Sequence, residues 1–545
     1  MCGFVGGNKP EWNYNKAIQS IIYRGPDGSD IKKFGELTMA FCRLAVQDLS
    51  IEAMQPMSDP DNRVHIVFNG EIYGYEDIRN ELKRKYLLKT TSDTEVILYL
   101  YLEYGINFID KIDGIFSIAI YDERINQVIL FRDRIGVKPL FYYYDGNDFA
   151  FASELKAFEE LMNDRTLQID NTALYDSLFY LYVPEPKTMY RNIYKLRPAT
   201  MMIFDLKKKK IACENNYWNL SISEKVERKR SREEIADDIK CLVSKSIKKQ
   251  LIADVPIGTF LSGGVDSSIV TYEANRINKD ILAYSIGFEE LQFDESKRAK
   301  LFCENKNIKL KQRILCNNDV KSIKSKLRYW YTEPFGDTSA YPSYLVSKFA
   351  REDCTVVLTG DGGDELFGGY DRYKYFKQRG EKIEKKDIHG IFTPDKSAVE
   401  DFRIQWNIPK DYSPYWHFDE YIIEDLPVVT KLRYLDLKTY LPELILTKID
   451  RVSMAVSLEA RVPFLAREIV EYAFMLSEEE YMPEDDLKGC IKDAYRYIIP
   501  DEILYGIKMG FAIPNNYLWK ENHEKNQFAG IVKTQWNDLT KICFG

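Results

Sequence analysis

The sequence predicts two domains: a layered α+β domain over residues 1–205, then an α/β domain with a parallel sheet and a helical C-terminal part over residues 206–545. At 545 residues the chain is longer than a single hydrophobic core normally supports. Strand-like runs dominate the first part, whereas strand and helix patterns alternate in the second, as they do when helices connect parallel strands. From about residue 380 onward the pattern is mostly helical.

The first part combines short strands with two helices. Val64, Ile66 and Phe68 alternate with polar neighbours, which predicts a strand buried on one face only. Further strand-like runs cover residues 115–121, 128–131, 140–144 and 200–206, and helices are expected over residues 76–86 and 94–104. This mixture favours a layered α+β domain.

The second part follows a polar, charged stretch at residues 221–234, which resembles a linker that leads into a helix. Apolar runs at residues 255–261, 281–288 and 355–358 predict strands, and helical patterns at residues 266–276 and 295–305 lie between them. Strands that alternate with helices in this way imply a parallel sheet.

The charge balance argues against nucleic acid as a partner. The formal net charge is −8, whereas nucleic-acid platforms are normally basic. Residues 207–210 are four consecutive lysines, but strand-like stretches flank this run, so a solvated hairpin turn is the better interpretation.

The composition also excludes several classes of protein. The nine cysteines show no CxxC pair or regular spacing, so neither a disulfide framework nor a zinc site is expected. No apolar run approaches the roughly 18 residues of a membrane-spanning helix, and the N-terminus lacks the features of a secretory signal. A cytoplasmic protein without a membrane partner is therefore expected. None of the four histidines lies in a motif, so the catalytic base is not expected to be an imidazole.

Cys2 is the most informative single residue. If Met1 is removed, Cys2 carries both a thiol and a free α-amine. An α-amine has a pKa of about 7.7–8.0, so it can act as the general base for the neighbouring thiol. Taken alone, however, Cys2 is explained equally well as an inert apolar residue.

Other residues of the first part could complete an amidase site around Cys2. The sequence Asn69-Gly70-Glu71 follows the strand at residues 64–68, where it could direct an amide and a backbone N–H at one oxygen, as an oxyanion hole requires. Arg43 and Asp93 carry the charges that would bind the carboxylate and the amine of an amino acid. Taken singly, Arg43 could form a surface ion pair and Asp93 could cap a helix.

Several segments resemble the glutaminase domain of asparagine synthetases, which are N-terminal-nucleophile amidotransferases. The segments are Met1-Cys2-Gly3, Arg24-Gly25-Pro26-Asp27, Asn69-Gly70-Glu71-Ile72-Tyr73, Ser92-Asp93-Thr94-Glu95 and Arg132-Asp133-Arg134-Ile135-Gly136-Val137-Lys138-Pro139-Leu140. The resemblance implies an N-terminal-nucleophile layered sandwich with Cys2 as the nucleophile and with Asn69 and the Gly70 N–H as the oxyanion hole. It also implies that Arg43 and Asn69 contact the bound glutamine, Arg43 at its α-carboxylate, and that Glu71 and Asp93 bind its α-amine.

The second part contains a loop suited to an anion. The sequence Ser262-Gly263-Gly264-Val265-Asp266-Ser267-Ser268 lies between a predicted strand and a predicted helix, and its glycines allow close approach of the backbone. It is not a Walker motif, because no Gly-Lys-Ser/Thr closes it. It resembles the pyrophosphate loop of ATP pyrophosphatases, which cleave ATP to AMP and pyrophosphate.

A second acidic, glycine-rich segment, Thr359-Gly360-Asp361-Gly362-Gly363-Asp364, follows the strand at residues 355–358. Asp266 and Asp364 are predicted to bind magnesium, because carboxylates bridged by phosphate oxygens commonly hold this ion. A pair of capped turns is the structural alternative. Acids and glycines at the C-terminal ends of parallel strands, where such sheets bind ligands, favour the metal.

Three later segments extend the resemblance to asparagine synthetases over nearly the whole chain: Lys448-Ile449-Asp450-Arg451-Val452-Ser453-Met454-Ala455, Glu459-Ala460-Arg461-Val462-Pro463-Phe464-Leu465 and Lys508-Met509-Gly510-Phe511. The resemblance implies that aspartate attacks the α-phosphate of ATP to give an acyl-adenylate, and that ammonia from Cys2 travels through the interior to displace AMP. Lys508 would neutralise the phosphates, and Asp361 would orient the amine or the intermediate. The implied ATP contacts are Leu261, Ser262, Gly263, Gly264, Asp266, Ser267, Ile286, Thr359 and Gly360.

Four positions depart from the usual family pattern, namely Tyr23, Cys42, Ala45 and Ala466. None of them removes a predicted catalytic group. With these departures, the sequence predicts the type of reaction more closely than it predicts which carboxylate accepts the ammonia.

The alternative is a glutamine-dependent amidotransferase that acts on another carboxylate, such as a uronic acid of a surface polysaccharide. The intact predicted sites disfavour a non-catalytic relative, the acidic balance disfavours a tRNA-modifying enzyme, and Cys2 disfavours enzymes that close β-lactams or lasso peptides. A homodimer is one possible assembly, which the sequence does not fix.

Overall fold

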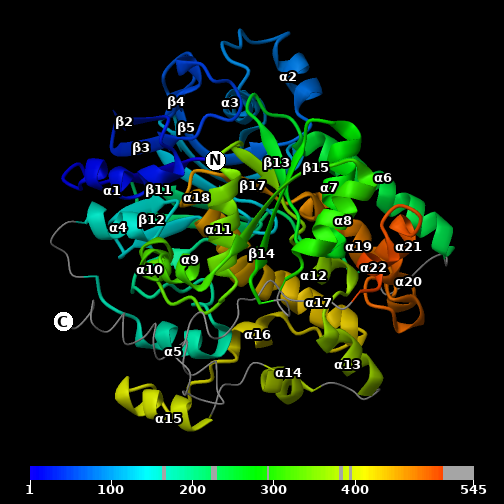
Figure 1. Ribbon diagram of the computed structural model, residues 1–545. Coiled ribbons are helices and arrows are strands. Elements are labelled where there is room, and N and C mark those ends of the chain that lie inside the picture. Colours follow the sequence, from blue (N-terminus) through cyan, green and yellow to red (C-terminus); the bar gives the residue numbers. More distant parts are fainter. Residues whose placement is uncertain (163–166, 223–229, 291–293, 380–383, 392–395, 507–545) are drawn as a thin grey trace.

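Three sheets form the framework of the molecule (Figure 1). The computed structural model describes residues 1–162, 167–222, 230–290, 294–379, 384–391 and 396–506. Two antiparallel sheets of six strands make up the first part, and a parallel sheet of five strands lies in the second. The predicted order of an α+β sandwich followed by an α/β domain is confirmed.

The two antiparallel sheets pack face to face. The first has the strand order β10-β8-β9-β1-β3-β2, and the second β12-β11-β7-β6-β5-β4. Their strands are β1 (Gly3–Gly7), β2 (Gly28–Phe34), β3 (Leu37–Arg43), β4 (Met57–Ser58), β5 (Val64–Ile72), β6 (Gly114–Asp122), β7 (Gln127–Arg132), β8 (Phe141–Tyr144), β9 (Phe149–Ala152), β10 (Ile193–Lys195), β11 (Thr200–Asp205) and β12 (Lys210–Asn216). Side chains of both sheets, among them Phe4, Phe41, Val67 and Leu130, form the core between them.

Helices cover the outer faces of this sandwich. They are α1 (Tyr14–Ser20), with α4 (Lys156–Leu161) beside it, over the first sheet and α3 (Asp93–Tyr104) over the second, with α2 (Glu76–Leu82) against α3. Helix α5 (Asn171–Tyr180) packs instead against the second part, where its Asp176 contacts Tyr412 and Trp416. Helix α3 packs on the second sheet, where Val96 and Leu100 share a core with Val64 and Ile66. The prediction that the strand at residues 64–68 is buried on one face only is therefore wrong. Strand β5 is buried along its whole length, because α3 covers one face and the first sheet covers the other.

The lysine run lies where a hairpin turn was predicted. Strands β11 and β12 pair antiparallel, and the exposed residues 207–209 connect them. Because β12 pairs with β11, the second sheet continues to Asn216. The division of the chain at residue 205 stays a prediction.

The second part is an α/β domain with further helices. The strand order is β15-β14-β13-β16-β17, and all neighbouring strands are parallel. The strands are β13 (Ile257–Phe260), β14 (Leu282–Phe288), β15 (Lys309–Leu315), β16 (Val356–Leu358) and β17 (Glu459–Arg461). The α-helices are α6 (Arg232–Gln250), α7 (Val265–Ile277), α8 (Ser296–Lys306), α9 (Asn317–Lys321), α10 (Lys324–Tyr331), α11 (Ala340–Ala350), α12 (Gly363–Phe367), α13 (Asp371–Arg379), α14 (Lys385–Ile391), α15 (Lys396–Gln405), α16 (Trp416–Tyr421), α17 (Val428–Lys438), α18 (Thr447–Met454), α19 (Arg467–Met475), α20 (Glu478–Tyr481), α21 (Gly489–Tyr495) and α22 (Asp501–Leu504).

The strand order places a ligand site beside β13. The chain proceeds from β13 to β14 and β15 on one side, and then returns to β16 and β17 on the other. In open α/β sheets, ligands bind at the carboxyl ends of the strands where the order reverses in this way. The loops after β13 and β16 meet at this point.

Candidate active sites

Cys2 and Asn69 lie in contact at one end of the sandwich. Cys2 precedes β1 and is buried, and its backbone N–H donates to Oδ1 of Asn69 at 3.0 Å. Its Sγ lies 3.8 Å from the carbonyl oxygen of Leu44. Burial raises the pKa of the Cys2 thiol, and the nearby N-terminal amine and Arg43 oppose that rise. The structure therefore brings together the predicted nucleophile and the predicted oxyanion-hole amide, while their roles stay predictions.

Gly70 can only be glycine in this arrangement. Its φ is +153°, and a Cβ at this position would lie 2.0 Å from the carbonyl oxygen of Ile115 on the paired strand β6. A side chain would thus separate β5 from β6 beside Cys2. The expectation that Asn69-Gly70-Glu71 lies after the end of the strand is wrong, because β5 continues through these residues to Ile72.

The guanidinium of Arg43 keeps its charge available for a ligand. Arg43 lies at the end of β3, and its guanidinium donates to the carbonyl oxygens of Ser50, at 2.5 Å, and of Asp48. Within the described part of the chain, no carboxylate forms an ion pair with it. A cation held by neutral carbonyls is suited to bind a carboxylate.

Glu71 and Asp93 belong to a buried cluster of acids that includes Glu459 from β17. Glu71 accepts from the amide of Gln47, and Asp93 accepts from the backbone N–H of Ile72 at 3.2 Å. Burial raises the pKa of Glu71 well above its usual range, and the charges of Glu459 and Asp93 raise it further. Burial likewise raises the pKa of Asp93 to about 6. Such a cluster is suited to bind a cation.

The cluster already contacts an ammonium group. The amine of Met1 donates to Glu459 at 2.6 Å, and both groups are fully buried. The guanidinium of Arg461 contacts Glu459 at 2.6 Å and lies 3.6 Å from Glu71. Sequence reasoning used Glu459 and Arg461 only as family motifs, and no local signal connected them with a site in the first domain.

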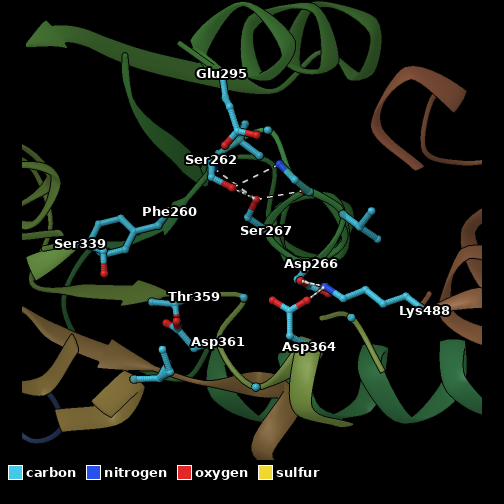
Figure 2. Close-up of a pocket in the computed structure, with 18 of the residues that line it drawn as sticks. Phe260, Ser262, Asp266, Ser267, Glu295, Ser339, Thr359, Asp361, Asp364 and Lys488 are labelled. Carbon is cyan, nitrogen blue, oxygen red and sulfur yellow. Dashed lines mark hydrogen bonds and ion pairs between the residues drawn. The ribbon is translucent and has the colours of Figure 1, made fainter. Parts of the chain in front are cut away.

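The second site is a cavity of about 520 Å³ beside β13 and β16. All nine predicted ATP contacts line it, and so do Asp361 and Asp364. The loop after β13 is held by its serines, since Ser262 and Ser267 share a hydrogen bond of 3.0 Å and the backbone N–H of Gly264 donates to Ser262. Figure 2 shows these hydroxyls together at the start of α7, where an anion is favoured.

The loop after β16 packs directly against this serine loop. A Cβ on Gly360 would lie 2.8 Å from the backbone nitrogen of Ser267, so a glycine is needed for the close approach. The backbone N–H of Thr359 donates to the carbonyl oxygen of Arg461 on β17 at 2.9 Å. Burial raises the pKa of the Asp361 carboxyl, and the nearby Lys448 opposes that rise.

Lys488 forms ion pairs with both predicted magnesium ligands, Asp266 and Asp364. Its Nζ contacts Asp266 and lies 2.7 Å from Asp364 (Figure 2). Burial opposes the charge on Lys488, but the two carboxylates outweigh it and raise its pKa. Sequence reasoning missed Lys488, because no motif includes it and 222 residues separate it from Asp266. The predicted charge-neutralising residue, Lys508, lies outside the described residues.

The carboxylates of Asp266 and Asp364 fit a magnesium ion that takes its other ligands from phosphate and water. Both carboxylates reach one ammonium group, so they lie close enough to share a cation, and hard oxygen donors suit magnesium. Over the described ranges, no group of three or more histidine, cysteine, aspartate or glutamate residues could hold a metal by itself.

Buried ion pairs connect the two parts of the chain. Arg24 donates to Asp450 at 2.8 and 3.1 Å and to Glu154 at 2.7 Å. Lys138 lies 3.6 Å from Asp450, and Arg451 lies 3.0 Å from Glu154. These residues belong to the quoted family motifs, apart from Glu154, so the motifs without a predicted role form this interface.

The departures from the family pattern leave these contacts in place. The hydroxyl of Tyr23 donates to Glu154 at 2.6 Å, beside Arg24. The backbone N–H of Ala45 donates to Asp27 at 2.8 Å. Cys42 is fully buried between β1 and β2, and its Sγ lies 3.6 Å from the carbonyl oxygen of Ile21.

Comparison with known proteins assigns both parts of the chain. The profile of the asparagine synthase family matches residues 238–535, and that of the glutamine amidotransferase domain matches residues 1–218. No helix among the described residues is long and apolar enough to cross a membrane.

Curated relatives resemble the chain over most of its length. Asparagine synthetase [glutamine-hydrolyzing] 1 of Bacillus subtilis is 29% identical, over 99% of this chain and 91% of its own. A protein of Methanocaldococcus jannaschii, provisionally named asparagine synthetase [glutamine-hydrolyzing] 2, is 35% identical over 72% of this chain and 82% of its own. Asparagine synthetase [glutamine-hydrolyzing] 3 of Bacillus subtilis is 29% identical, over 93% of this chain and 86% of its own.

Proposed function

The chain belongs to the asparagine synthase family, and on this basis we propose that it converts aspartate to asparagine with ammonia taken from glutamine. ATP would activate the aspartate, and AMP, pyrophosphate and glutamate would be the other products. We further propose that residues 1–205 form the glutaminase and residues 206–545 the synthetase. The separate family matches, to residues 1–218 and 238–535, support two parts of this kind.

Glutamine hydrolysis is proposed to begin at Cys2 after removal of Met1. The freed α-amine takes the thiol proton, and the sulfur bonds to the carbonyl carbon (Cδ) of the glutamine side-chain amide while Asn69 and the Gly70 N–H stabilise the oxyanion. The proton passes to the amide nitrogen, which leaves as ammonia, and water then hydrolyses the thioester to glutamate. Arg43 would bind the α-carboxylate of glutamine, and Glu71 and Asp93 its α-ammonium.

Amidation is proposed to take place in the cavity beside β13. A β-carboxylate oxygen of aspartate bonds to the α-phosphorus of ATP as the bond to pyrophosphate breaks. The serine loop and Lys488 would stabilise the charge that develops on the phosphates, together with Lys508. Asp266 and Asp364 would hold magnesium, which supplies positive charge to the pyrophosphate when bound.

The second half of the amidation uses ammonia. Its nitrogen attacks the acyl carbon of the adenylate, AMP leaves, and the nitrogen loses a proton. Asp361 is proposed to orient the ammonia or accept this proton, because a carboxylate in a cavity that binds phosphates would otherwise be repelled by them. Ammonia would travel from Cys2 to this cavity inside the molecule, whose two parts are held in contact by the buried ion pairs.

One observation carries the proposed function. Every predicted ATP contact lines a single cavity, at the point where the strand order reverses, in a chain that also places Cys2 against Asn69.

The test is to supply purified protein with aspartate, ATP, magnesium and glutamine. We expect asparagine, AMP, pyrophosphate and glutamate in equal amounts. ADP as the nucleotide product, or glutamate without asparagine, would contradict the proposal.

The alternative acceptor, the partners, the location and the assembly of the enzyme stay predictions. A uronic acid as acceptor is not favoured, because the relatives that resemble the chain over most of its length are named asparagine synthetases. The substrates are proposed to be small molecules without nucleic acid or membrane partners. A cytoplasmic location and a homodimer remain untested expectations.

A further inference from the structure

A second lysine enters the cavity, away from Lys488. Lys448 lies on α18 and is 8% exposed. Its Nζ donates to Oγ of Ser339 at 2.9 Å and lies 3.4 Å from Oδ2 of Asp337. All three side chains line the cavity, and none of them has a part in the proposed glutaminase or phosphate chemistry.

Lys448 and Lys488 serve different regions of the cavity. Lys488 contacts the two carboxylates beneath the serine loop, whereas Lys448 contacts the loop before α11. Figure 2 shows Ser339 and Lys488 on opposite sides of the cavity, with Asp361 on the side of Ser339. The region around Lys448 is therefore separate from the proposed phosphate site.

The charges around Lys448 suit a particular class of ligand. One cation is flanked by two carboxylates, because Asp337 contacts Lys448 and Asp361 interacts with its charge. A ligand with only a carboxylate would be attracted by Lys448 and repelled by both acids. A ligand with an ammonium and a carboxylate on one carbon would satisfy both charges. A lysine has three donors, so Lys448 can bind a carboxylate and keep both present contacts.

We propose that Lys448, Asp337 and Ser339 form the subsite that recognises the amino-acid end of the acceptor, an inference that rests on the proposed function. Lys448 binds the α-carboxylate, Asp337 binds the α-ammonium, and Ser339 holds Lys448 in place. The β-carboxylate then points toward the α-phosphate. The subsite selects an α-amino dicarboxylic acid over a dicarboxylic acid without an amine and over a uronic acid.

The test compares aspartate with succinate, which lacks the amine, in wild type and variants. Asp337→Asn should raise the KM for aspartate by about tenfold or more, as the loss of a charged hydrogen bond does. It should also lower the ratio of kcat/KM for aspartate over succinate by a similar factor. The KM for ATP and the glutaminase kcat/KM should change less than about twofold, since neither depends on this subsite. Ser339→Ala should give a smaller rise in the KM for both acceptors, because Ser339 acts through Lys448.

Lys448→Met should raise the KM for both acceptors, and Lys448→Arg should restore part of the loss. Lys348→Met is the matched control, because Lys348 is an exposed lysine on α11 outside the cavity. A parallel rise in the KM for ATP and aspartate, or an unchanged preference over succinate in Asp337→Asn, would overturn this inference and leave the proposed function intact. A wild type that amidates a uronic acid and not aspartate would overturn both.

Discussion

Arg24 and Asp450 are 426 residues apart in the chain and are joined by two hydrogen bonds of 2.8 and 3.1 Å. The side chain of Arg24 is 0% exposed and that of Asp450 3% exposed. The contact belongs to the interior, although its partners come from different parts of the chain. A buried pair of this kind ties the two parts together, because separating them would break the contacts of Asp450 with both Arg24 and Lys138.

Loss of Arg24 should therefore destabilise the protein. Arg24→Met leaves Asp450 and Glu154 buried without this partner, and breaking such a pair costs about 3–5 kcal/mol. Denaturant unfolding of the whole chain measures the change. Arg197→Met, which removes the exposed ion pair with Glu420, is the control and should cost less than about 1 kcal/mol. Equal losses in the two variants would show that burial of Arg24 does not matter.

Loss of the Cys2 thiol should separate the two activities. Cys2→Ala is expected to abolish glutamine hydrolysis and to keep most ammonia-dependent synthesis, because the residues proposed to bind ATP line a cavity that does not include Cys2. Retention of Met1 should act in the same way, since the amine is then an amide and no base. Cys241→Ala, at an exposed cysteine, is the control for thiol loss. If Cys2→Ala loses both activities equally, the prediction that the two activities are separable is wrong.

Lys488→Met should impair the synthetase alone. The variant removes the cation between Asp266 and Asp364, and we expect synthesis to fall by about 100-fold or more from either nitrogen donor. Glutaminase activity should remain. Lys377→Met, which breaks only the contact with Asp485 at the surface, should retain full synthesis. Normal exchange of pyrophosphate into ATP in Lys488→Met would refute a role near the phosphates.

Asp361 and Asp364 should differ in the step that they support. Asp364→Ala is expected to fail with any acceptor, because this carboxylate contacts Lys488 and is a proposed magnesium ligand. Asp361→Ala should still bind ATP. It should not form asparagine, because the step in which the acceptor or ammonia takes part should fail. Calorimetric titration with ATP and magnesium, combined with an assay of asparagine formation, distinguishes the two. Glutaminase activity serves as the check that each variant folds.

Binding of glutamine should weaken in acid. Asp93 must be ionised to bind an ammonium, and burial raises its pKa to about 6. As the pH falls through about 6, Asp93 gains a proton and loses its charge, so the KM for glutamine should rise. The KM for ATP should not follow this change. In Asp93→Asn the KM for glutamine should be high already at pH 8, and the step near pH 6 should disappear. A step that survives in the variant would assign it to another group.

The position of the cavity beside β13 could be predicted well, because many of its lining residues belong to local motifs. Glycines that permit close backbone approach and serines at a helix start are contiguous in residues 262–268, so a site suited to an anion could be predicted there before the fold was known. The same holds for Cys2, whose position next to the N-terminus is itself the signal. For these residues the structure added mainly the distances between them.

The other features of the fold and of the sites could not be predicted, because they depend on contacts between segments that are distant in the sequence. Lys488 lies in a left-handed conformation just before α21, outside any motif, and only the fold brings it to Asp266. Strand β17 has three residues, too few for a periodic pattern. The alternation in β5 suggested one exposed face, because no local pattern can show that a second sheet covers it.

Strand β17 has a consequence for any attempt to exchange domains between relatives. Its backbone pairs with β16, next to the loop at residues 359–362, while the side chains of Glu459 and Arg461 contact the cluster beside Cys2. A glutaminase cut out by its sequence boundary would leave this strand behind and expose Glu71 without its cation. A functional chimera must therefore take residues 459–461 from the same parent as the N-terminal domain, although more than 200 residues lie between them.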